Sequence, residues 1–162
     1  MTESDPGKER SLTVEQYRQI ARNITDLVWR LLDKVELTED EADRLIHAAY
    51  AVRFHHGEFG DPIDIARAEW HLARANLKVH RPVPALYHGH KCLEVCRDNE
   101  LGPFTIAYAY EALARTAAVV GDENALDEYL RLAKMYGKMI EKDDDMKIFF
   151  ADLSTVPGYE ED

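Results

Sequence analysis

All seven histidines of this 162-residue chain fall between positions 47 and 90, which raises the question of a metal site. Among them, His88 is followed by Cys92 and Cys96 at four-residue intervals, so the three would share one face of a helix. Two thiolates and an imidazole are ligands that zinc prefers. A cysteine at helical spacing is, however, more often a small buried apolar residue. We therefore expect no metal and no cofactor. The seven histidines are His47, His55, His56, His71, His80, His88 and His90.

Sequence motifs of known catalytic and cofactor sites are absent. The chain has no Glu-x-x-His pair for a di-iron bundle, no H-E-x-x-H for a zinc protease, no glycine-rich phosphate loop and no G-x-S-x-G nucleophile. The acidic run 143–145 lacks the glycine and the distal glutamate of a calcium loop. No catalytic residue can be named, and the sequence favours a non-catalytic protein, although an active site assembled from distant residues stays open.

Length and charge restrict the class of protein. A chain of 162 residues, 46% of them hydrophobic, is long enough for one domain with a substantial core. The formal net charge of −11 disfavours general binding of nucleic acid, because the overall field repels phosphate backbones. No apolar run reaches the roughly 20 residues that span a bilayer, and the first ten residues are polar. From these two features we expect a cytoplasmic location and no membrane partner. With only two cysteines we also expect reduced thiols.

The sequence as a whole predicts helices separated by short breaks. Thr13 with Gln16 and Thr38 with Glu41 are capping boxes, and each precedes apolar residues at helical spacing. Proline or aspartate after a break marks the later helix starts. No stretch alternates with period two, so no strand is expected. The predicted helices cover about 13–34, 38 to Gly57 or Gly60, 62–79, 84–98, 103–120 and 123–140, with a short seventh at 145–153.

An internal repeat relates two of these helix pairs. Residues 70–75 align with 111–116 at an offset of 41, and Ala85-Leu86 aligns with Ala125-Leu126 at an offset of 40. In each copy a small residue, Ala73 or Ala114, would let two helices approach closely. Each copy therefore predicts one antiparallel helical hairpin.

The repeat resembles the tetratricopeptide repeat, in which a bulky residue, a leucine and a small residue of one helix meet an alanine of the next. The matching residues are Trp70, Leu72, Ala73 and Ala85 in the first copy and Tyr110, Leu113, Ala114 and Ala125 in the second. The resemblance covers roughly 65–137. The period is longer than the usual 34 residues, and the proline expected after each second helix is absent. The string from Ala66 to Arg115 is also similar to short bacterial proteins of this type, which implies no activity.

This resemblance implies an all-α fold of antiparallel hairpins stacked as a short right-handed superhelix. We expect a mobile tail at 1–12, a single tetratricopeptide-like domain at 13–153, and an acidic tail at 154–162. Within the domain, 13–60 forms an N-terminal hairpin that caps the array, and 61–100 and 101–141 form the repeat hairpins.

Tetratricopeptide-like arrays bind partners on the concave surface that the first helix of each hairpin lines. The predicted partner-binding residues on these helices are Arg67, Trp70 and Arg74 with Tyr108, Glu111 and Arg115. Arg74 and Arg115 are equivalent in the repeat, so their guanidinium groups would lie side by side and suit a carboxylate. The alternative is structural, because Glu111 precedes Arg115 by four residues, the favourable order for an ion pair within a helix.

The leading hypothesis is a non-catalytic module that binds a protein or peptide segment, one that can carry an acidic group, in this groove. The alternative is a ligand-binding or metal-binding protein, or an enzyme, that uses the histidine-rich segment 47–90. A deep pocket that brings His71, His88 and a carboxylate within hydrogen-bonding distance would favour the alternative. Self-association into a homo-oligomer through an exposed helical face is the third hypothesis.

Overall fold

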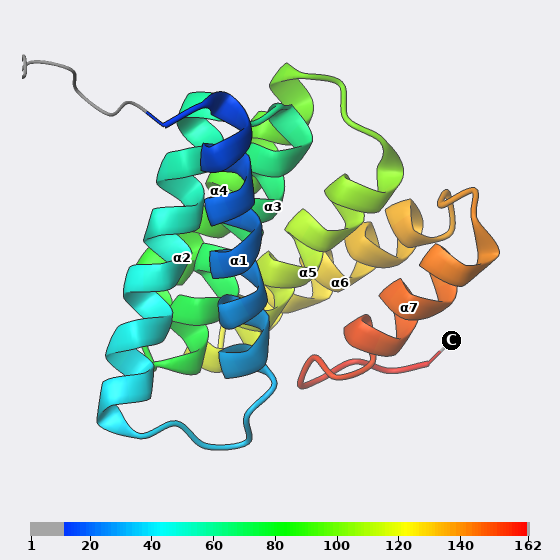
Figure 1. The fold of residues 1–162 in the computed structure, drawn as a ribbon. Helices are drawn as coiled ribbons and strands as arrows, with labels where there is room; N and C mark the ends of the chain where they lie inside the picture. The colour runs from blue at the N-terminus through cyan, green and yellow to red at the C-terminus, as the bar shows by residue number, and fades with distance from the viewer. Residues whose placement is uncertain (1–11, 162) are drawn as a thin grey trace, which may run out of the picture.

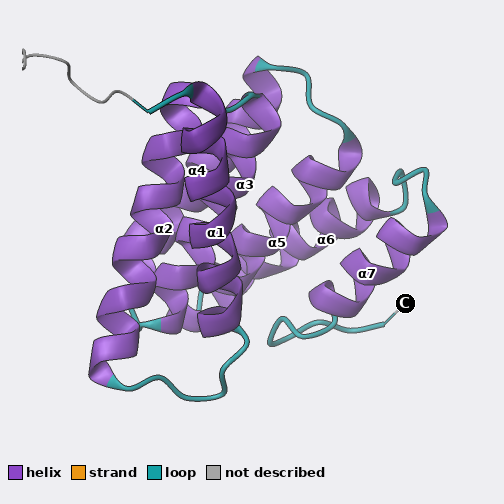
Figure 2. Ribbon diagram, viewed as in Figure 1, coloured by secondary structure: helices purple, strands orange, loops and turns teal. Residues whose placement is uncertain are grey.

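A computed structural model describes residues 12–161 and contains seven helices in this part of the chain, with no strand (Figures 1 and 2). The predicted all-α class is therefore confirmed. The predicted tail at 1–12 lies outside the described residues except for Leu12. The helices are α1 (Val14–Leu32), α2 (Glu39–Phe59), α3 (Pro62–Lys78), α4 (Pro82–Asp98), α5 (Pro103–Val120), α6 (Glu123–Gly137) and α7 (Asp143–Leu153).

Local capping signals set the helix starts. Both predicted capping boxes form: the Thr13 hydroxyl accepts from the amide of Gln16, and that of Thr38 accepts from the amide of Glu41. Asp61 caps α3 in the same way, with Asp64 as its partner. Each bond satisfies an amide that has no acceptor within its own helix.

Three predicted boundaries are wrong by a few residues. Helix α4 begins at Pro82 rather than Pro84, because amides in the first turn need no intrahelical acceptor and both prolines fit there. Helix α6 ends at Gly137, short of the predicted residue 140, and α7 begins at Asp143 rather than Asp145. The three aspartates 143–145 all lie in the first turn of α7, where the helix dipole favours negative charge.

Consecutive helices pack against one another as hairpins. Helices α1 to α4 lie side by side, whereas α5 and α6 diverge from them and α7 lies beside the α5 and α6 pair (Figure 1). No helix in the described part of the chain is long and apolar enough to cross a membrane.

Helix α3 is central because it contributes to both hydrophobic cores. Its Leu72 packs with Val28 and Leu45 in a core shared with α1 and α2. Its Trp70 belongs to the second core, which contains residues of α4 to α7 and includes the fully buried Phe149 of α7. The repeat-related alanines are buried at Ala73, Ala85 and Ala114 and half-buried at Ala125.

Candidate functional site

An apolar cavity of about 380 Å³ lies where α1, α3, α5 and α7 meet. This volume falls within the range of small-molecule sites, which are concave and mainly apolar with a few placed polar groups. We call it the aromatic cavity. Its aromatic lining consists of Trp29 of α1, Trp70 and His71 of α3, and Phe104 and Tyr108 of α5.

The rings of this cavity contact one another from one helix to the next. The ring of Trp70 lies 5.4 Å from that of Trp29 and 5.4 Å from that of Tyr108, measured between centroids. Phe104 is one helical turn before Tyr108, and their rings are 5.0 Å apart. The chain has only two tryptophans, so its tryptophan fluorescence comes entirely from this lining.

The lining also contains His71, a polar side chain that is buried and has no hydrogen-bond partner in the described part of the chain. It is 4% exposed, and neither ring nitrogen has a hydrogen-bond partner within the described residues. Its ring lies 5.0 Å from that of Trp29 and 5.2 Å from that of Trp70. Burial, with smaller contributions from nearby His56, Arg67 and Arg74, lowers the pKa of His71 from 6.5 to about 4. The imidazole is therefore neutral at pH 7.

This depressed pKa predicts a loss of stability in mild acid. As the pH falls from 6.5 to about 4, His71 takes up a proton in the unfolded chain but not in the folded one, so unfolding becomes more favourable. The free energy of unfolding should fall by about 3 kcal/mol through this group. Urea denaturation at several pH values would measure this loss. The variant His71→Phe should lack this part of the pH dependence, and an unchanged dependence would contradict the assignment.

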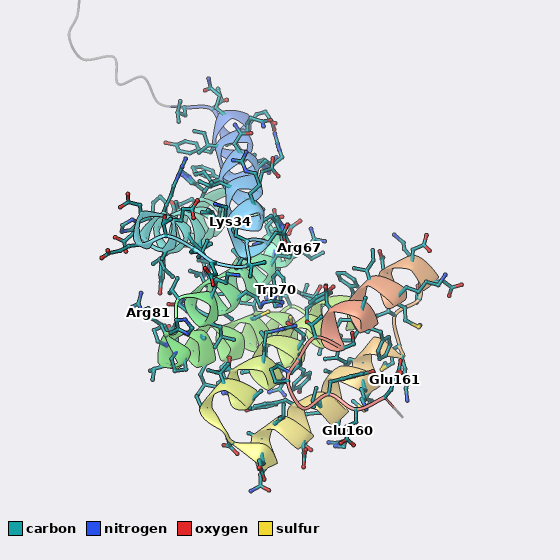
Figure 3. The ribbon with its side chains drawn as sticks, turned by 90° about the horizontal axis from the view of Figure 1, so that it is seen from below. Lys34, Arg67, Trp70, Arg81, Glu160 and Glu161 are labelled. Carbon is teal, nitrogen blue, oxygen red and sulfur yellow. The ribbon has the colours of Figure 1, made fainter. Side chains whose placement is uncertain are left out.

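Arg67 lies one helical turn before His71 and is exposed. It has no hydrogen bond or ion pair within residues 12–161 and lines the aromatic cavity. Arg67, His71 and Thr25 also line a second hollow of about 360 Å³. We call this second space the polar hollow, and its other polar side chains are Gln19, Arg22, Asn23, Asp26, His56 and Asp64. Figure 3 shows Arg67 and Trp70 on α3, between the N-terminal helices and α7.

The six predicted partner-binding residues divide into two groups. Arg67, Trp70 and Tyr108 line the aromatic cavity. The other three form a buried ion cluster, which we call the Glu111 cluster, in which the fully buried Glu111 carboxylate is the acceptor. It accepts from Trp70 Nε1 at 2.9 Å, from Arg74 at 3.2 Å and from Arg115 Nε at 2.6 Å. Both guanidinium groups therefore neutralise an internal carboxylate.

Helix α7 covers part of the face of α5 that would line a groove. Arg115 also donates to the carbonyl of Asp152 at 3.0 Å and to the hydroxyl of Thr155 at 2.7 Å. The Tyr108 hydroxyl donates to the Asp152 carboxylate at 2.6 Å, and burial together with this carboxylate raises the pKa of Tyr108. Ile148 and Asp152 of α7 thereby become part of the cavity wall.

His88 belongs to a separate buried network. Its Nδ1 lies 2.7 Å from Glu69, its Nε2 lies 3.0 Å from the Tyr50 hydroxyl, and Arg53 donates to Glu69 at 2.6 Å. Burial alone would raise the pKa of Glu69, but the hydrogen bonds from His88 and Arg53 hold it below its ordinary value. His88 lines neither hollow, so the described residues do not bring His71, His88 and a carboxylate together.

The two cysteines of the metal hypothesis are buried beside each other on α4. The hydrogen bond between them lowers the pKa of Cys96, whereas this bond and burial raise the pKa of Cys92, so only one of the two favours the thiolate that zinc binds. Within residues 12–161 no group of three or more histidine, cysteine, aspartate or glutamate side chains is arranged to hold a metal ion.

No known protein family matches the chain, and neither does any curated protein sequence or solved structure. The function must therefore be inferred from the aromatic cavity and the side chains around it.

Proposed function

We propose that this protein is a non-catalytic binding protein that holds a small ligand in the aromatic cavity. The observation that carries the proposal is His71, a buried side chain on the cavity wall with two ring nitrogens that no described residue satisfies. A buried polar group without a partner costs about 1–3 kcal/mol, so a fold that retains one invites a functional explanation. A ligand that hydrogen-bonds to the imidazole supplies one.

The surroundings of His71 favour binding over catalysis. A histidine that acts as a general base is usually oriented by a carboxylate on its other nitrogen, and His71 has none. A histidine with a carboxylate partner does occur in His88, which contacts Glu69, but the other ring nitrogen of His88 is already bonded to Tyr50.

We further propose that the protein acts in the cytoplasm as a diverged tetratricopeptide-like array. Its two unpaired buried cysteines support the location, and its paired helices support the array.

A protein or peptide segment is the second candidate partner, and the rim of the cavity favours it. Trp29 is 42% exposed and Ile148 is 57% exposed, so large apolar side chains border the opening. Such residues are enriched at protein interfaces. A partner of this kind would insert one apolar side chain into the cavity and rest on the rim.

Occupation of the cavity can be tested with a neutral aromatic probe, N-phenyl-1-naphthylamine. The probe should bind one site per chain and quench Trp29 and Trp70 by energy transfer. The variant Thr105→Phe, which places a ring in the cavity wall, should weaken probe binding about tenfold, a change typical of losing one well-filled contact region.

The matched control is Val119→Phe, which introduces the same ring at an exposed position of the same helix, away from the cavity. Circular dichroism would establish that both variants fold. Equal affinity of the probe for the two variants, or no saturable binding to the wild-type protein, would overturn the proposed function.

A further inference from the structure

We propose that the ligand of the aromatic cavity is a small carboxylic acid with an aromatic or bulky apolar body, whose carboxylate binds Arg67 and His71. This inference rests on the proposed function and adds the chemical class of the ligand. The two residues are one turn apart on α3, and both line the aromatic cavity and the polar hollow, so the acid group would sit at the boundary between the two.

The apolar end of such a molecule fits the lining inside the cavity. Trp70 and Tyr108 meet at an interplanar angle of 81°, and Phe104 and Tyr108 at 61°, so the inner walls present both ring faces and ring edges. Aromatic groups favour such edge-to-face contacts. Ile148 of α7 adds an aliphatic side chain at the rim of the cavity.

The side chain that would bind the charged end of the ligand is a cation near the cavity that has no ion-pair partner in the described part of the chain. Arg74 and Arg115 pair with Glu111, and Arg22, which lines the polar hollow, pairs with Glu15 at 2.6 Å. Arg67 has no such partner within the described residues. Its guanidinium group is therefore available for the two-point contact that a carboxylate accepts.

His71 complements Arg67 as a neutral donor. A neutral imidazole offers one N–H, so Arg67 and His71 together supply one cation and one further hydrogen bond. That set matches a singly charged carboxylate, whereas a phosphate group carries more charge and more acceptors than these two side chains satisfy. Burial is the main cause of the low pKa of His71, and Arg67 and Arg74 contribute to it.

The acidic side chains near this boundary bear on whether the ligand also carries an amino group. Asp152 accepts a hydrogen bond from the Tyr108 hydroxyl. The Asp64 carboxylate accepts one from the backbone amide of Asp61 and lies 3.9 Å from His56. Asp26 lines the polar hollow and has no hydrogen bond or ion pair within the described residues. An amino group beside the carboxylate, as in an aromatic amino acid, would meet Asp26, whereas a plain acid would not use it.

The test compares three probes of similar shape by tryptophan fluorescence and calorimetry: 3-phenylpropanoate, its neutral amide 3-phenylpropanamide, and L-phenylalanine. The acid should bind the wild-type protein about tenfold more tightly than the amide, the usual effect of one charge-assisted contact. The variant Arg67→Met keeps the apolar stem and should reduce the affinity for the acid to that for the amide. The variant Arg44→Met, which removes an exposed arginine that lines neither hollow, should change nothing.

Each outcome separates the two proposals. Equal binding of acid and amide, or an acid affinity that survives Arg67→Met, would overturn the carboxylate assignment while probe binding to the cavity still supports the proposed function. If L-phenylalanine binds more tightly than the plain acid, the assignment holds and the ligand carries an amino group. If neither acid binds although N-phenyl-1-naphthylamine does, the carboxylate assignment is wrong. Loss of all binding, the neutral probe included, would overturn both.

Discussion

Replacing Glu111 with glutamine should lower the free energy of unfolding by about 3 kcal/mol, because removal of one partner leaves buried charges without compensation. The Glu111 carboxylate is fully buried and accepts three hydrogen bonds, two of them from guanidinium groups. Glutamine has the same shape but only one acceptor oxygen and no charge. Arg74, whose pKa burial already lowers, would lose its only ion-pair partner among the described residues.

Urea denaturation of the two proteins measures this difference directly. The matched control is Glu128→Gln, which applies the same substitution to an exposed glutamate paired with Arg131 on the surface of α6. An exposed pair of this kind contributes little, so this variant should be close to the wild-type protein. If Glu111→Gln proved as stable as Glu128→Gln, the cluster would not compensate the buried charges in the way its geometry implies.

The Glu111 cluster also explains how the fold holds the cavity wall. Trp70 donates its Nε1 hydrogen to Glu111, and the Arg74 guanidinium lies 5.2 Å from the centre of the Trp70 ring. Both contacts fix the ring that also meets the rings of Trp29 and Tyr108. Arg74 and Arg115, two of the three arginines predicted to bind a partner, therefore help to hold the wall in place, and Arg67 is the one that we propose binds the ligand.

Local signals explain why the helices could be predicted so closely. A capping box or a proline acts within one helical turn, so Thr13, Thr38, Asp61 and Pro103 set their helix starts whatever surrounds them. The end of α6 could not be predicted from such local signals. At Gly137 a Cβ atom would lie 2.5 Å from the side chain of Phe149, so this position depends on a helix that follows it in the chain.

The candidate site could be predicted only in part for the same reason. The repeat identified Arg67, Trp70 and Tyr108 as neighbours, because equivalent positions of stacked hairpins face the same side. It gave no sign of Trp29, which α1 brings in, or of Ile148 on α7. Phe104 was within reach, since it precedes Tyr108 by one turn. The alternative that Glu111 pairs with Arg115 is what the structure shows.

Helix α7 is the least predictable wall of the cavity, and truncation of its anchor should therefore have a large effect. Phe149 is fully buried, its ring lies 5.1 Å from that of Tyr108, and it fills the space left by Gly137. The variant Phe149→Ala should lower the free energy of unfolding by about 3–5 kcal/mol, the usual cost of deleting a buried phenylalanine ring.

The same variant should also weaken binding in the cavity, because α7 supplies Ile148 and Asp152 to its wall. Since α7 lies near the end of the described chain, its detachment can precede global unfolding and would appear as faster hydrogen exchange confined to 143–153. The neighbouring variant Ile148→Ala removes a largely exposed side chain, so it should reduce probe binding with little loss of stability. If Phe149→Ala left both stability and probe affinity unchanged, α7 would not be the wall that completes the site.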